Sequence, residues 1–107
     1  MKSTAPKHLS TEARRWWDRI AGEYDLGEDH GPLLLQTALE AFDRMRGCQK
    51  QIAKDGPMLP DRFGQLKAHP LLAAERDSRA QMMQAIKQLG LDIEPPNPFM
   101  GRPPGIR

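Results

Sequence analysis

The chain has 107 residues, 38% of them hydrophobic, and its 16 lysines and arginines against 14 acidic residues leave a formal charge of only +2. A chain of this length forms one domain with a modest core, burying about two thirds of the surface that unfolding exposes. The small charge excludes the strongly basic surface of a tight duplex binder. No apolar run is long enough to cross a membrane, and the single Cys48 excludes an internal disulfide. We therefore expect a soluble intracellular protein.

The first helix is predicted directly after a polar N-terminal segment. Residues 1–9 are expected to form a flexible basic arm. Ser10 then offers a side-chain oxygen as N-cap, and the apolar residues from position 13 to 24 recur at the spacing of one helix face. Both tryptophans fall inside this apolar stripe, so we expect four side chains to anchor the helix in the core: Trp16, Trp17, Ile20 and Tyr24.

The basic residues of this helix fall outside the stripe. Arg15 and Arg19 share one flank, and helical geometry turns them away from the tryptophans. A base-stacking surface needs aromatic rings beside exposed cations, so the separation favours a structural role for the tryptophans. The arginines then form either a solvated helix face or, together with Lys2 and Lys7, a set of contacts to DNA phosphates.

A turn and a long second helix follow. Residues 25–32 hold two glycines, three acidic residues and a proline, which predicts a turn. The helix is predicted from Pro32 to Lys54, with Asp55-Gly56-Pro57 ending it, and would be on the order of 35 Å long. Its apolar spacings of three and four are typical of a coiled-coil seam, which we expect to pack between subunits through Leu35, Leu39, Phe42, Met45 and Ile52.

The last third of the chain is less regular. Residues 58–69 have too little periodicity to decide between a loop and a short hairpin around Gly64, and a third helix is predicted from Pro70 to Leu89, closed by Gly90. The end of the chain carries five of the ten prolines and predicts a disordered tail. This tail is either a degradable end or a peptide that docks on a partner, through Phe99, Met100 and Arg102.

Signals of catalysis are weak. The three histidines stand in separate segments, and no pair of His or Cys residues has the spacing of metal ligands. The chain contains neither a phosphate-binding glycine loop nor a nucleophile elbow. Asp25, Glu28 and Asp29 could hold a cation, but helix capping explains them more simply, and Cys48 is expected to be an inert thiol. We therefore expect no catalytic residue, no metal and no cofactor.

A series of short motifs runs through residues 6–94. In order they are Pro6, Leu9-Ser10 with Glu12-Ala13, Trp16-Trp17, Tyr24, LEAFDR at 39–44, Ile52 with Asp55-Gly56, Gly64 with Lys67 and His69-Pro70, and Leu89-Gly90-Leu91-Asp92. Their order and spacing together resemble the phage terminase small subunits, in the short family without an obvious N-terminal helix-turn-helix.

The resemblance implies a non-catalytic component of a viral genome-packaging motor in the cytoplasm of the bacterial host. Such proteins are helical, assemble into rings, bind viral double-stranded DNA for packaging initiation, and regulate the large subunit that carries the ATPase and nuclease. The matched motif positions are mainly structural, so the resemblance assigns no DNA-contacting residue.

These considerations predict an all-α domain of about three helices with a long central helix, which assembles into a ring. Its parts are a basic arm (1–9), a helical oligomerisation and DNA-binding domain (10–91) and a Pro-rich tail (92–107), and its expected phosphate contacts are Lys2, Lys7, Arg14, Arg15 and Arg19. The nearly balanced charge also allows a helical adaptor that binds only protein. A helix-turn-helix repressor fits less well, because the connection from Asp55 to His69 is far longer than that motif's turn.

Overall fold

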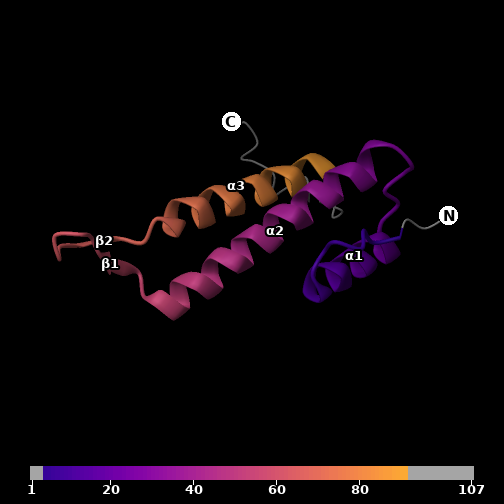
Figure 1. The fold of residues 1–107 in the computed structure, drawn as a ribbon. Helices are drawn as coiled ribbons and strands as arrows, with labels where there is room; N and C mark the ends of the chain where they lie inside the picture. The colour runs from indigo at the N-terminus through magenta and orange to yellow at the C-terminus, as the bar shows by residue number, and fades with distance from the viewer. Residues whose placement is uncertain (1–3, 92–107) are drawn as a thin grey trace, which may run out of the picture.

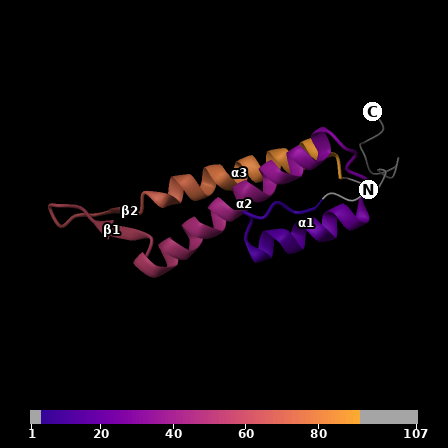
Figure 2. The ribbon, with the colours of Figure 1, turned by 45° about the vertical axis from the view of Figure 1, so that its right-hand side comes forward.

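The computed structural model describes residues 4–91, which form three helices and a small two-stranded sheet (Figure 1). The long helix α2 is central, and α1 and α3 pack along different sides of it in both views (Figures 1 and 2). The prediction of a small helical domain with a long central helix is confirmed. In chain order the elements are α1 (Thr11–Glu23), α2 (His30–Asp55), β1 (Met58–Pro60), β2 (Leu66–Ala68) and α3 (Leu71–Leu89).

The helix ends follow from the sequence signals. Ser10 caps α1 as predicted, since its side chain accepts a hydrogen bond from the backbone N–H of Ala13 at 3.0 Å. The backbone N–H and hydroxyl of Ser10 also donate to the two carboxylate oxygens of Asp43, at 2.9 and 2.6 Å, which fixes the start of α1 against α2. Gly56 ends α2 and Gly90 ends α3, as predicted, although α2 begins at His30 rather than at Pro32. None of the helices in residues 4–91 is long and apolar enough to cross a membrane.

The segment before α1 is packed, which corrects the prediction of a flexible arm for its second half. Leu9 is buried in the core, and Ala5 packs against the same cluster. His8 lies 2.7 Å from Glu40 on α2. Residues 5–9 therefore belong to the folded domain, because Leu9 supplies apolar surface that α2 covers. Residues 1–3, including Lys2, lie outside the described part.

The apolar seam of α2 forms the core of this chain. Trp17 of α1 packs with four side chains of α2, and Met82 and Leu89 of α3 close the cluster from the other side. Four of the five residues predicted to pack between subunits are therefore buried within their own subunit, and that assignment is wrong for them: Leu35, Leu39, Phe42 and Met45. The seam is covered because α1 and α3 both pack on it, and only Ile52, near the end of α2, is partly exposed.

The segment that sequence periodicity left undecided is a β-hairpin. β1 and β2 pair antiparallel with Leu59 opposite Lys67, and the loop between them contains Gly64 at a φ of 83°, a backbone conformation that favours glycine. α3 then returns antiparallel to α2, because Gln49 contacts Glu75 and, further back along α2, Arg44 contacts Gln81. The hairpin therefore projects beyond the end of the helical layer (Figures 1 and 2).

His69 joins the end of α2, the hairpin and the start of α3. Its ring is only 4% exposed, with Nδ1 accepting the backbone N–H of Leu71 at 3.0 Å and Nε2 at 2.9 Å from Asp55. Because Nδ1 accepts, Nε2 carries the proton and donates it to the Asp55 carboxylate. The backbone N–H of His69 also donates to the carbonyl of Pro57 at 2.7 Å. This histidine therefore holds the α2–α3 connection closed.

Gly31, in the first turn of α2, lies in close contact with the backbone of the α1–α2 turn. A Cβ atom at this position would lie 1.8 Å from the backbone carbonyl oxygen of Leu26 and 2.7 Å from its carbon. Real Cβ atoms do not come this close, so a side chain would force the turn away from the helix. Gly47, in the same helix, has open space around its Cβ position.

We expect Gly31→Ala to lower the free energy of unfolding by at least about 2 kcal/mol, because the backbone of the turn must shift to admit the methyl group. Gly47→Ala is the matched control and should instead raise stability by roughly 0.5–1 kcal/mol, the usual gain for a helix interior. Urea denaturation followed by circular dichroism measures both. Equal effects of the two substitutions would contradict the close contact at Leu26.

The Asp55 carboxylate should make stability sensitive to acid. Its pKa is lowered from the ordinary 3.8, first by a hydrogen bond from Gln51 and then by the one from His69. A lowered folded-state pKa stabilises the protein above the unfolded value, and this stabilisation is lost as the pH falls through the folded-state pKa. Between about pH 5 and pH 2 we expect the free energy of unfolding to fall more steeply in the wild type than in Asp55→Asn. Parallel acid dependences in the two proteins would refute the contribution of Asp55.

Candidate nucleic-acid interface

The two tryptophans of α1 have different environments. Trp17 is 2% exposed and lies in the core, as predicted, whereas Trp16 is 44% exposed. The prediction that Trp16 is a core residue is therefore wrong. Successive residues of a helix are about 100° apart, so two adjacent side chains cannot both face a single neighbouring helix, and Trp16 lies at the edge of the apolar stripe. Ile20 and Tyr24 are partly buried beside the core.

Trp16 lies beside a cation. The guanidinium carbon of Arg19 is 5.9 Å from the centre of the Trp16 ring, a cation–π contact worth about 0.5–1 kcal/mol at an exposed site. The prediction that helical geometry separates the aromatics from the arginines therefore fails for this pair. Arg19 follows Trp16 by three residues and shares its side of the helix. An exposed aromatic ring beside exposed cations is the arrangement that single-strand-binding surfaces use, and on a duplex the cations alone can contact phosphates.

Arg15 extends this surface toward α2. It lines a groove of about 630 Å³ between the start of α1 and the middle of α2, together with Arg46 and Lys50. Two acidic side chains in the groove are already engaged, since Asp43 accepts two hydrogen bonds from Ser10 and Glu12 lies 3.2 Å from Arg46. Among residues 4–91 neither Arg15 nor Lys50 forms an ion pair, so both cations are available to an anionic ligand.

We call this surface the α1 basic flank, comprising Arg15, Trp16 and Arg19 of α1 and Lys50 of α2. Lys50 was missed by sequence reasoning, because no local pattern indicates that the middle of α2 lies beside the start of α1. Arg14 is also exposed. Because it precedes Arg15 by one residue, its side chain points about 100° away from that of Arg15, to the other side of α1. Lys7 is exposed in the segment before α1, so the structure does not bring all the predicted phosphate contacts together.

Within residues 4–91 no group of three or more His, Cys, Asp or Glu side chains could hold a metal ion. Cys48 is a partly buried free thiol. Asp25, which sequence analysis considered as a cation ligand, accepts a hydrogen bond from the backbone N–H of Gly27 at 3.0 Å and shapes the α1–α2 turn.

Comparison with known families decides the affiliation of this chain. A family model described as phage terminase, small subunit, matches residues 13–95. The chain belongs to this family. The match begins inside α1, covers every helix and strand that follows, and confirms the resemblance read from the motif order. No curated protein and no solved structure matches the chain significantly.

Membership of the terminase small subunits gives the motif positions a structural meaning. Ser10, Asp55, Gly56, His69 and Gly90 cap helices or close the α2–α3 connection. These positions maintain the fold, and of the five only Ser10 lines the groove that contains Arg15 and Lys50. The residues predicted to dock on the large subunit lie outside the described residues: Phe99, Met100 and Arg102.

The unequal burial of the two tryptophans predicts that their substitution lowers the free energy of unfolding by different amounts. Trp17→Ala should cost about 3–5 kcal/mol, because it removes the largest core side chain of α1 and leaves a cavity. Trp16→Ala should cost roughly 1–2 kcal/mol, since the ring is only partly buried and makes one weak cation–π contact. Thermal and urea unfolding of the two variants measure the difference. Equal losses would contradict the separation of the two rings.

Proposed function

We propose that this terminase small subunit binds viral double-stranded DNA through the α1 basic flank for packaging initiation. It regulates a large subunit that carries the ATPase and nuclease, is not itself catalytic, and acts as a homo-oligomeric ring in the cytoplasm of the bacterial host. Family membership supports the general role. The exposed Trp16 beside Arg19, with Arg15 and Lys50 free of acidic partners in the described chain, supports the surface.

The chemistry of this surface suits a sugar–phosphate backbone. Guanidinium groups donate paired hydrogen bonds to phosphate oxygens, and the Lys50 ammonium adds a point charge. The Trp16 ring supports the guanidinium of Arg19 and offers apolar area to the deoxyribose. None of these contacts reads the base sequence, so the flank positions the protein on DNA without specifying a site.

A ring compensates for the small charge of each copy. One chain carries a formal charge of +2, too little for strong binding at physiological salt. When several copies are held on one DNA, each further flank binds at a raised effective concentration, and the weak contacts multiply. Arg14 and the N-terminal Lys2 and Lys7 are further phosphate contacts in this proposal, and Phe99, Met100 and Arg102 remain the proposed contacts to the large subunit.

The test of DNA binding is a charge reversal on the flank. Arg15→Glu with Arg19→Glu should weaken binding to duplex DNA at least tenfold. It should also reduce the slope of log affinity against log salt by roughly 2 for each chain that contacts the duplex, because about two phosphate contacts are lost per chain. Fluorescence anisotropy with a labelled duplex at several salt concentrations gives both quantities.

Arg76→Glu with Lys87→Glu, on exposed side chains of α3, is the matched control, because it changes the net charge equally on a different helix. Equal losses in the two double variants would assign binding to overall charge and remove the flank as the site. Absence of any wild-type binding at about 50 mM salt would instead favour the alternative, a helical adaptor that binds only protein.

A further inference from the structure

The β1–β2 hairpin exposes a wholly apolar face. Its register places Met58 opposite Ala68 and Pro60 opposite Leu66, and alternate residues of paired strands share one face. All four side chains are exposed, Leu66 by 64% and Met58 by 47%. A two-stranded hairpin is marginally stable alone, and small soluble proteins rarely leave such a face uncovered.

The hairpin tip presents an aromatic ring and a cation. Phe63 is 76% exposed, and the guanidinium carbon of Arg62 lies 5.3 Å from its ring centre. Asp61 fixes the loop by accepting the backbone N–H groups of Phe63 at 2.8 Å and Gln65 at 2.9 Å. The tip is therefore held in a conformation that points its largest apolar side chain into solvent.

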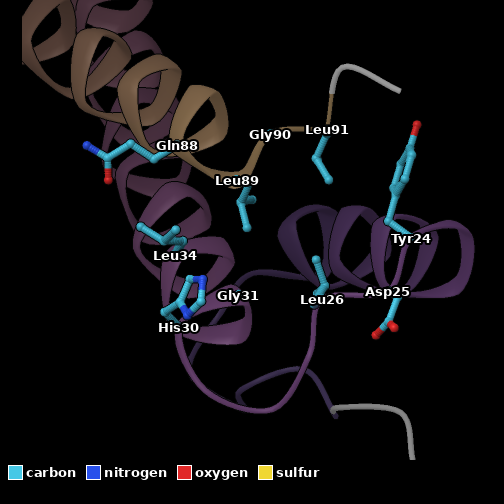
Figure 3. A pocket seen from close by; sticks show the side chains of 10 residues that line it. All are labelled: Tyr24, Asp25, Leu26, His30, Gly31, Leu34, Gln88, Leu89, Gly90 and Leu91. Carbon is cyan, nitrogen blue, oxygen red and sulfur yellow. The ribbon is translucent and has the colours of Figure 1, made fainter. Parts of the chain in front are cut away.

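A pocket lies at the other end of the helical layer. It has a volume of about 280 Å³, near the lower end of the range for pockets that bind small ligands, and lies between the end of α1, the start of α2 and the residues after α3. Figure 3 shows Leu26, Leu89 and Leu91 pointing into the space between these segments, with Tyr24 beside them. The carboxylate of Asp25 points away from the leucines. The pocket therefore combines these three leucines with polar side chains, among them His30 and Gln88, and has the acidic Asp25 at its edge.

The two ends carry opposite charge. Residues 24–31, the turn beside the pocket, contain three acidic residues and no lysine or arginine, whereas residues 58–68, the hairpin, contain two basic residues and one acidic residue. On the hairpin Lys67 lies 3.7 Å from Asp61, so Arg62 is the cation without an acidic partner among residues 4–91, while Asp25, Glu28 and Asp29 lie in the turn beside the pocket. Such complementarity attracts the hairpin end of one molecule to the pocket end of another.

One chain cannot join its own two ends. The hairpin follows the last residue of α2 and the acidic turn precedes the first, so a 26-residue helix, about 39 Å long, separates them. Both views place them at opposite ends (Figures 1 and 2). The acidic turn that complements the hairpin in charge is therefore available only on a second copy.

We propose that subunits join head to tail, with the β1–β2 hairpin of one copy seated at the Tyr24–Leu91 pocket of the next. Phe63 enters the pocket beside Leu26, Leu89 and Leu91, and Arg62 faces the acidic turn. Each copy donates one hairpin and receives one, a heterologous contact that closes into a ring when the rotation between neighbours permits. This inference rests on the ring of the proposed function and uses no residue of the α1 basic flank.

A mixing experiment tests the contact. Arg62→Glu with Phe63→Ser blocks the hairpin, and Glu28→Lys with Asp29→Lys blocks the pocket; all four side chains are exposed, so both variants should fold. Each alone should weaken self-association at least tenfold and elute near 12.1 kDa. Mixed together, they retain one intact hairpin and one intact pocket, and should form a species of roughly twice that mass. Gel filtration with light scattering measures the masses, and circular dichroism verifies folding.

Arg76→Glu, on an exposed side chain of α3, is the control and should assemble like the wild type. Wild-type-like assembly of either blocked variant, or a mixture that stays monomeric, would overturn the head-to-tail contact while leaving the DNA-binding proposal intact. A wild type that is monomeric at every concentration would remove the ring and this contact together. Removing residues 92–107 should leave assembly unchanged; stronger assembly would show that the chain's own tail competes for the pocket.

Discussion

The two-sided packing of α2 is the constraint on which the rest of the structure depends. Trp17 from α1 and Met82 and Leu89 from α3 meet side chains of the same central helix, so neither outer helix has a core without it. In a chain of this size that single cluster supplies most of the available apolar burial. Because α2 is rigid, its two ends also fix the positions of the hairpin and of the acidic turn, and its middle places Lys50 beside α1.

The helices could be predicted from the sequence because their signals are local. Ser10 marks the start of α1 and Gly90 the end of α3 through hydrogen bonds to backbone atoms a few residues away. The apolar periodicity indicated the helices between them. The hairpin could not be predicted, because its closure depends on contacts across the chain, such as that of His69 with Asp55. The seam of α2 was recognised but assigned to the wrong partner, since periodicity shows that a face is buried and does not show what covers it.

The candidate site shows the same limit. Placing Trp16 and Trp17 in one broad apolar stripe was reasonable for an isolated helix, yet α2 covers only part of that stripe and leaves Trp16 outside. The approach of Arg19 to the Trp16 ring follows from a spacing of three residues and was available from the sequence. The contribution of Lys50 could not be predicted from the sequence, because it depends on the angle at which α1 crosses α2.

The loop at the hairpin tip has a consequence for recognition. Asp61 accepts two backbone N–H groups with one carboxylate oxygen, and its own backbone pairs with Gln65 and Gly64, so the five residues from 61 to 65 are largely ordered before any partner arrives. A segment that is already ordered has little conformational entropy left to lose on association. More of the free energy from burying Phe63 then remains as affinity, which allows a small contact area to hold.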